Sequence, residues 1–191
     1  MNQTTQTFMK RFILILAITA GLHFSASAQT LLNVGIGYYG ENVTHPGVVL
    51  EFEYERYFSE GFSLPLRADI GFHSNPDYNA FTIDVHKGFR KYFNSGLFLE
   101  QSLGAGLIAK GYKTDYWYSD EYAHSIPHGN TTVWGFMPSV TVGAGYNLSK
   151  DKEGSDLIWI RPKVYWDLGF RGLYLPYTAL QIGYTHTFKT K

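Results

Sequence analysis

The chain has 191 residues, in which 16 Lys and Arg are balanced by 16 Asp and Glu, and it contains no cysteine. This neutral balance argues against a nucleic-acid-binding protein, and the lack of cysteine excludes disulfides as a source of stability. The 20 Gly, 15 Tyr and 14 Phe, without any helix-length apolar pattern, favour an all-β barrel or sandwich.

Residues 1–28 have the order of a secretory signal peptide. Lys10 and Arg11 precede an apolar run from Phe12 to Leu22, and the small residues Ala26-Ser27-Ala28 follow it. The run is shorter than the ~20 apolar residues of a spanning helix, which argues against a membrane anchor. We therefore expect residues 1–28 to be cleaved and residues 29–191 to form one domain.

Eight segments in the rest of the chain alternate apolar with polar or small residues at a period of two, which indicates β-strands. They are residues 31–39, 48–58, 62–72, 80–93, 97–110, 132–148, 157–168 and 177–188. Their lengths of 9 to 17 residues exceed the average globular strand and are enough for the ~9–11 residues that cross a bilayer. We expect tight turns after the second and fourth segments, and longer connections after the first, third, fifth and seventh, as in outer-membrane barrels.

Two barrels fit this pattern: a soluble lipocalin-like barrel with the apolar faces inward, or a membrane barrel with these faces outward. The polar faces carry small residues such as Gly104 and Gly106 together with most of the charge. This composition suits the narrow, filled lumen of an eight-stranded barrel. Aromatic residues near the strand ends suggest an interfacial girdle: Phe58, Phe62, Phe93 and Phe188 on the short-turn side, and Phe72, Phe81, Trp134 and Trp166 towards the loops.

These features favour an all-β, eight-stranded antiparallel up-and-down transmembrane β-barrel. A charge that faces lipid at mid-depth costs about 2–4 kcal/mol, so we expect the charged faces to line the lumen and to pair there. Simple hairpin registers place Glu53 opposite Arg67 and Arg90 opposite Glu100. The predicted lumenal charge network, which would close the barrel as a plug, comprises Glu51, Glu53, Glu55, Arg67, Asp69, Asp84, Arg90, Glu100, Arg161 and Lys163.

The longest connection, about residues 111–131, is the candidate binding loop because Tyr and Trp supply large contact areas at low entropic cost. Two interpretations stay open: a cell-surface binding or adhesion loop, or an extension of the hairpin in which the aromatic rings pack on each other. The aromatic residues in question are Tyr112, Tyr116, Trp117, Tyr118 and Tyr122.

Catalytic and metal-binding patterns are weak. A lipid-modifying hydrolase or acyltransferase needs His beside Ser and an acid, and His124-Ser125 and His73-Ser74 are the nearest pairs. Adjacent residues of an extended strand point to opposite faces, so neither pair makes a good nucleophile and base. His124 and His128 have no predicted helix to hold them on one metal. We therefore expect no enzymatic activity, no metal and no cofactor.

The signal peptide, eight strands, tight turns, charged polar faces and near-terminal Phe188 together resemble the small bacterial outer-membrane β-barrel-domain family, which includes OmpA/OmpX-like barrels and the PorT-like group of Bacteroidota. The resemblance covers nearly all of residues 29–191 and carries no functional residue across. It implies insertion by the barrel-assembly machinery into the outer membrane of a Gram-negative cell, with membrane lipid around the barrel.

We expect a monomeric, non-enzymatic barrel with a plugged, charged lumen and a structural or surface-interaction role through its extracellular loops, which would bind an unknown extracellular ligand. The alternatives are a narrow pore, a transport or secretion-associated component, or a lipid-modifying outer-membrane enzyme.

Overall fold

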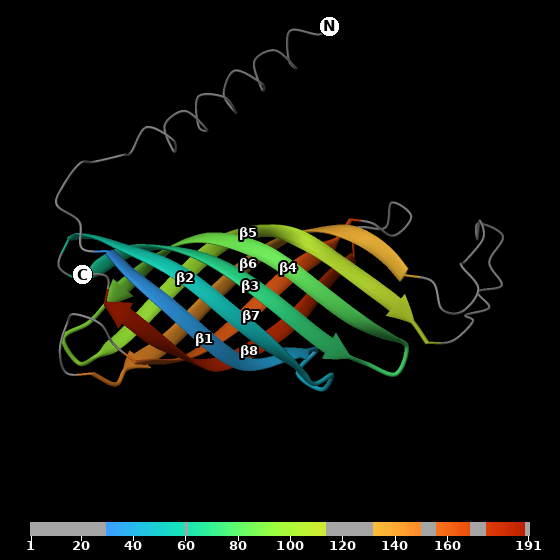
Figure 1. Cartoon of the computed structure of the whole chain (residues 1–191), viewed down its shortest axis with the longest axis horizontal. Coiled ribbons are helices and arrows are strands. Elements are labelled where there is room, and N and C mark those ends of the chain that lie inside the picture. The colour runs from blue at the N-terminus through green and yellow to red at the C-terminus, as the bar shows by residue number, and fades with distance from the viewer. Residues whose placement is uncertain (1–29, 60, 114–131, 150–155, 169–174, 190–191) are drawn as a thin grey trace, which may run out of the picture.

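The protein folds into a closed antiparallel β-barrel whose strands follow one another in chain order (Figure 1). The structure is a computed structural model that describes residues 30–59, 61–113, 132–149, 156–168 and 175–189. The strands are β1 (Thr30–Glu41), β2 (Gly47–Ser59), β3 (Phe62–Ser74), β4 (Tyr78–Tyr92), β5 (Leu97–Tyr112), β6 (Thr132–Asn147), β7 (Leu157–Asp167) and β8 (Leu175–Lys189).

Pairing of β1 with β8 closes the sheet, and every neighbouring pair is antiparallel. The predicted eight-stranded up-and-down barrel is therefore confirmed. The predicted signal peptide lies outside the described residues. None of the residues described here forms a helix long and apolar enough to cross a membrane.

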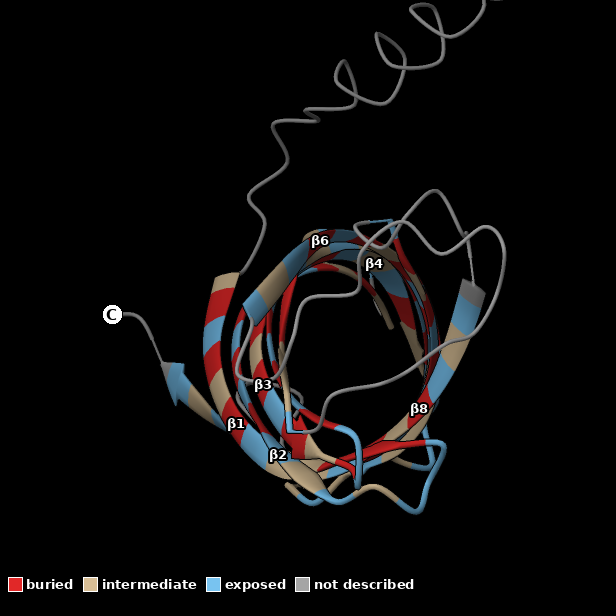
Figure 2. Ribbon diagram, turned by 90° about the vertical axis from the view of Figure 1, so that its right-hand side faces the viewer, coloured by how far each residue is buried: buried red, intermediate tan, exposed pale blue. Residues whose placement is uncertain are grey.

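Burial alternates along the strands, as the pleat of a β-sheet requires. An end-on view shows this alternation as bands of buried and exposed residues around the barrel (Figure 2). In β2, Glu51, Glu53 and Glu55 are buried, whereas Phe52 and Tyr54 are exposed. The apolar face therefore lies outside and the charged face inside, which contradicts the lipocalin-like alternative.

Side chains fill the interior, because an eight-stranded barrel leaves a space only as wide as its own side chains. Arg67, Arg90 and Arg161 are among the largest fully buried side chains. Glycine on the inward face makes room for them: a Cβ atom at Gly143 would lie 2.9 Å from Cγ of both Arg161 and Glu100. The glycine on β6 thus leaves space for large inward side chains on the neighbouring strands β5 and β7.

The connections follow the prediction at some hairpins only. Gly61 and Gly96 adopt positive φ angles of 75° and 89° at the tight turns after β2 and β4, which glycine tolerates without strain. The predicted longer connection after the third strand is wrong, since β3 and β4 are joined by residues 75–77. Asn75 Oδ1 accepts hydrogen bonds from the backbone N–H groups of Asp77 and Tyr78 at 2.9 and 2.8 Å. This side-chain turn lets both strands run further than the sequence pattern suggests.

Candidate functional site

The charged interior is the candidate functional site. The two predicted cross-strand pairs, Glu53 with Arg67 and Arg90 with Glu100, are confirmed by the strand registers. All ten residues predicted to line the lumen are buried in the barrel: Glu51, Glu53, Glu55, Arg67, Asp69, Asp84, Arg90, Glu100, Arg161 and Lys163.

Arg90 on β4 holds three carboxylates together. Its Nη1 and Nη2 atoms donate to the two carboxylate oxygens of Glu53 at 2.9 and 2.7 Å, the bidentate geometry that a guanidinium favours. Its Nε atom donates to Glu100 Oε2 at 2.8 Å, and Nη1 lies 3.1 Å from Glu55 Oε2. The ring of Phe98 lies 4.9 Å from the guanidinium carbon. Arg90 therefore ties β2 to β5 across the interior.

Glu100 on β5 is the centre of the network, because it contacts three arginines. Besides Arg90, Arg67 Nη1 donates to Glu100 Oε1 at 3.3 Å, and Arg161 on β7 forms a close ion pair with the same oxygen. Arg161 also forms a close ion pair with Glu51 on β2. Since β7 and β2 are not neighbours in the barrel, this pair crosses the lumen.

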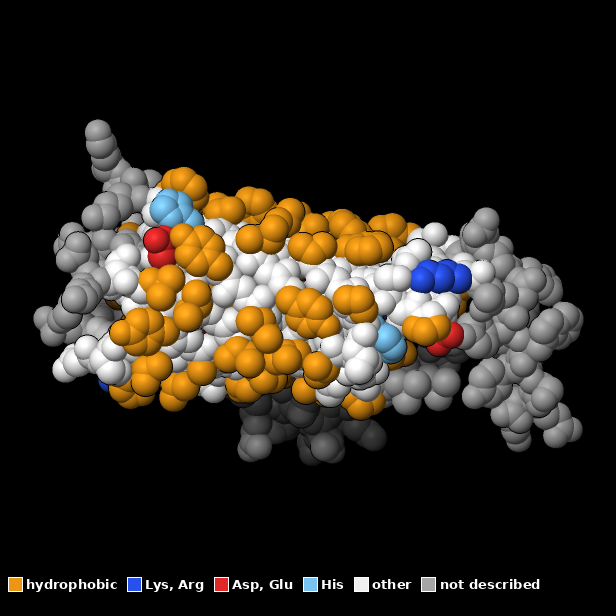
Figure 3. Space-filling model, turned by 90° about the horizontal axis from the view of Figure 1, so that it is seen from below, with side chains coloured by type: hydrophobic (Ala, Val, Ile, Leu, Met, Phe, Trp, Pro, Cys, Tyr) orange, Lys and Arg blue, Asp and Glu red, His pale blue; other side chains and the backbone are white. Residues whose placement is uncertain are grey.

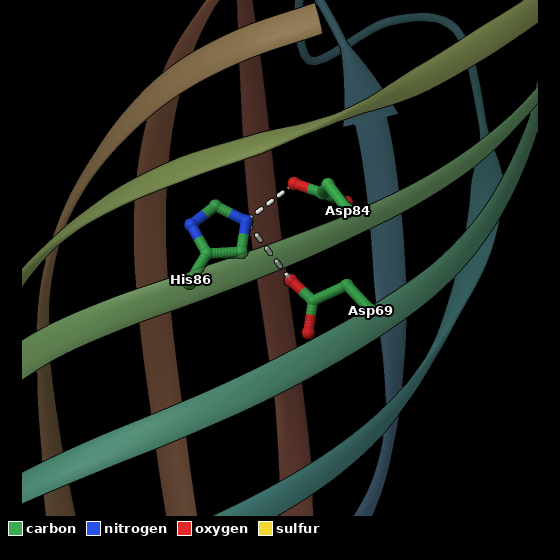
Figure 4. A group of neighbouring side chains, drawn as sticks. All are labelled: Asp69, Asp84 and His86. Atoms are coloured by element: carbon green, nitrogen blue, oxygen red, sulfur yellow. Dashed lines mark hydrogen bonds and ion pairs between the residues drawn. The ribbon is translucent and has the colours of Figure 1, made fainter.

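Asp69 and Asp84 lie directly opposite each other on β3 and β4, a placement in which like charges repel. His86 resolves part of this conflict, because its Nε2 atom contacts Asp84 closely and lies 3.7 Å from Asp69 (Figure 4). Lys163 Nζ lies 2.5 Å from Asp84, and Arg67 Nε donates to Asp69 at 3.1 Å. Each aspartate therefore has a cationic partner of its own.

The ligand atoms of Asp69, Asp84 and His86 lie within 4.8 Å of one another, and carboxylate with imidazole is a donor set that divalent metals accept. A metal here would have to displace the ammonium of Lys163 or bring a second positive charge beside it. We therefore assign the three side chains to the ion-pair network rather than to a metal site.

A buried cluster around Glu41, at the end of β1, was not predicted. The hydroxyl groups of Tyr78 and Tyr165 donate to Glu41 Oε1 at 2.8 and 2.7 Å. Asn75 Nδ2 donates to Glu41 Oε2 at 3.1 Å, and His73 Nε2 lies 3.5 Å from that oxygen. The signal that could have found this cluster is the inward period of the first strand, which continues beyond its predicted end to Glu41.

Lys110 and Asp167 form a further buried ion pair, with 2.8 Å between Nζ and Oδ2. The ammonium also lies 4.1 Å from the ring centroid of Tyr177 and 4.8 Å from that of Tyr78. Both charged residues fall on the inward face of their strands in the sequence, but their pairing depends on the closure of the barrel. The interior thus carries charge at both ends and in the middle.

Part of the predicted binding loop can be placed. Tyr112 ends β5 and packs against Tyr78, with ring centroids 5.7 Å apart.

Of the two candidate His-Ser pairs, the structure describes His73-Ser74. His73 is fully buried inside the barrel, whereas Ser74 is only partly buried. The remaining loop aromatics and the histidine candidates lie outside the described residues: Tyr116, Trp117, Tyr118, Tyr122, His124 and His128.

The exterior is largely apolar. Leu103 and Trp134 are 69% and 61% exposed, and Phe58, Phe72, Phe81, Phe93 and Phe188 of the predicted girdle are also exposed. On the face that Figure 3 shows, hydrophobic side chains cover the middle of the barrel and charged side chains lie near its two ends.

At one end of the barrel, a 2.7 Å hydrogen bond to His186 lowers the pKa of Asp156, which lies outside the strands.

The fold and the site together define a small barrel with a charged interior and an apolar exterior. The chain is similar to the crystal structure of Neisserial surface protein A, NspA, with a TM-score of 0.57 over 86% of this chain and 100% of that chain. The sequence identity is 6%, so the likeness concerns the fold. No family model matches the sequence, and no curated protein matches it either.

Proposed function

We propose that the protein is an integral outer-membrane β-barrel without enzymatic activity, whose interior is closed by ion pairs and whose loops have a structural or surface-interaction role. The observation that carries this proposal is the inverted polarity of the barrel, in which Glu51, Glu53 and Glu55 are buried while Phe52 and Tyr54 are exposed.

The exposed apolar surface supports a lipid environment. Soluble monomers rarely expose contiguous apolar patches larger than a few hundred Å², whereas exposed large hydrophobic residues occur here on all the strands from β1 to β8. In lipid these side chains contact acyl chains at no hydrophobic cost. The strands contain between 11 and 16 residues, enough for the ~9–11 residues that cross a bilayer at a tilt.

The packing of the interior supports a plug rather than a pore. Arg161 reaches from β7 to Glu51 on β2 and to Glu100 on β5, so charged side chains meet across the lumen. Separating one charged side chain from its partners would leave an unpaired buried charge, which is costly. The ion pairs therefore hold each of these side chains in place. A narrow pore or transport component, the alternative, would need a continuous water-filled path past these residues.

The location and partners complete the proposal. Residues 1–28 direct export, the barrel-assembly machinery inserts the barrel into the outer membrane of a Gram-negative cell, and the protein works there as a monomer without a cofactor. OmpA/OmpX-like or PorT-like barrels are the group proposed for it. The aromatic loop that follows β5 is the proposed contact site for an extracellular ligand, supported by its Tyr and Trp content.

Membrane fractionation combined with gel mobility tests this proposal. We expect the full-length protein in the outer-membrane fraction, resistant to carbonate extraction, and migrating differently before and after boiling because the folded barrel resists detergent. A periplasmic soluble protein fractionated in parallel serves as the control. Recovery of this protein with that soluble control would overturn the proposed location.

A further inference from the structure

Three cations interrupt the apolar exterior of the strands. Every Asp and Glu of the described strands is buried inside the barrel. In contrast, strand alternation directs Arg56 on β2 and both Lys87 and Lys91 on β4 outward, and Lys87 is exposed. All three lie in the half of their strand that is nearer to the tight turns. Among the described strand residues, the outward charges of this region are therefore positive.

The strand registers gather these cations around Phe89. Lys87 and Lys91 lie two residues to either side of it on β4, and its partner on β5 is the exposed Gln101. Arg56 pairs with Leu64 on β3, the strand between β2 and β4. Neighbouring strands are ~4.8 Å apart, so Arg56 lies about 10 Å from β4. At this separation the long side chains of Arg56 and of the lysines on β4 can contact the same ligand. We call Arg56, Lys87, Phe89, Lys91 and Gln101 the Phe89 patch.

Aromatic rings border the Phe89 patch on the side of the tight turn after β2. The rings of Phe58, Phe62 and Phe89 lie with centroids 5.4 to 6.0 Å apart. Lys91 Nζ lies 3.6 Å above the Phe62 ring. Lys87 makes no hydrogen bond or ion pair with the residues that the structure describes, so its ammonium lacks a counter-charge within the described barrel.

The outward position of Lys87 makes this lack costly. It lies five residues before the end of β4 at Tyr92, so it is about 13 Å along the barrel axis from that strand end at ~3.3 Å per residue and a tilt of ~40°. An outward lysine in the apolar belt of a membrane barrel extends its stem towards the headgroups, and its ammonium needs an anion there. The bilayer supplies that anion as a lipid phosphate.

We propose that the Phe89 patch binds the headgroup of an anionic glycerophospholipid in the leaflet next to the tight turns, with its acyl chains directed away from those turns. The proposal rests on the proposed membrane location of the barrel. Charge complementarity selects the anionic lipid, because the described strand residues of this region include three outward cations and no outward carboxylate, and because the ammonium of a zwitterionic headgroup would be repelled.

Lipid retention tests this site. The full-length protein is reconstituted into vesicles of phosphatidylethanolamine with a minor fraction of phosphatidylglycerol, released in mild detergent, and analysed for bound lipid by native mass spectrometry. We expect the wild type to retain phosphatidylglycerol above its bulk fraction. The variant Lys87→Gln/Lys91→Gln should lose about fivefold in retention for each lysine removed.

Lys113→Gln is the matched control, because Lys113 lies beyond the opposite end of β5 and donates to Ser74 Oγ at 2.8 Å. It should retain the lipid as the wild type does. The single variant Lys91→Gln, one residue from the strand end, gives the same comparison if the double variant does not fold.

Three results would overturn the proposal: no enrichment of phosphatidylglycerol by the wild type, equal retention by the wild type and the lysine variants, or preferential retention of lipopolysaccharide when both lipids are offered. Vesicle flotation separates this proposal from the membrane location. A protein that does not float with the vesicles refutes both, whereas an inserted barrel without selective retention refutes the lipid site alone.

Discussion

Replacement of Arg90 by methionine should destabilise the barrel strongly. Methionine keeps much of the length of the side chain but removes the charge that Glu53, Glu55 and Glu100 share. Glu100 would keep its contacts with other arginines. Glu53 would keep the hydrogen bond that Asn33 Nδ2 donates at 2.9 Å, which does not neutralise its charge.

The magnitude follows from the burial of Arg90, which is 0% exposed. Removal of one partner from a buried ion pair costs about 3–5 kcal/mol, because a buried charge is left unpaired. The bidentate contact with Glu53 and the further contacts with two carboxylates place Arg90→Met in the upper half of that range. Adding Glu53→Gln to Arg90→Met should recover about 1–3 kcal/mol, since the second change removes one of the unpaired charges.

Urea unfolding in zwitterionic detergent micelles, followed by tryptophan fluorescence and by heat-modifiable gel mobility, measures both changes. Arg56→Met, the same substitution at an outward position of β2, is the control and should cost less than about 1 kcal/mol. A cost of Arg90→Met no larger than that of this control, or a further loss of stability when Glu53→Gln is added, would refute the stabilising role of the buried ion pairs.

Three further substitutions test other parts of the barrel. Val140→Arg, midway along the outward face of β6, should lower stability in vesicles by about 2–4 kcal/mol, and Thr132→Arg at the strand end by about 1 kcal/mol or less; equal costs would contradict a lipid-facing belt. Gly143→Val should cost about 1–3 kcal/mol in the same unfolding titration, because its side chain meets Arg161 and Glu100, and a neutral result would show that the lumen has spare room. Lys163→Met should leave Asp84 open to Zn²⁺, so that Zn²⁺ raises the unfolding midpoint of the variant and not of the wild type; stabilisation of the wild type would instead favour a metal site.

The faces of the strands could be predicted because they are set locally. In β2 the alternation of Glu51, Phe52, Glu53 and Tyr54 is enough to assign the inward and outward sides once the barrel is known to have an apolar exterior. The Arg90–Glu100 pair was also within reach, since the tight turn fixes the register of its hairpin.

Contacts that depend on barrel closure could not be predicted. Arg161 and Glu51 are 110 residues apart, and their ion pair follows from the way β7 and β2 face each other across the lumen. The local pattern around either residue does not predict which residue it pairs with.

The side-chain turn at Asn75 was not predicted for a different reason. The polar residues on both sides of it suggest a loop, although they pair in β3 and β4.

Single-channel recording in a planar lipid bilayer tests the central claim, a membrane barrel closed by its own side chains, most directly. With insertion verified by heat-modifiable mobility, the wild type should show no steady conductance. The variant Arg90→Ala/Glu100→Ala/Arg161→Ala, which removes the side chains that meet in the lumen, should show stepwise openings. A large, steady conductance from the wild type would contradict the plugged interior.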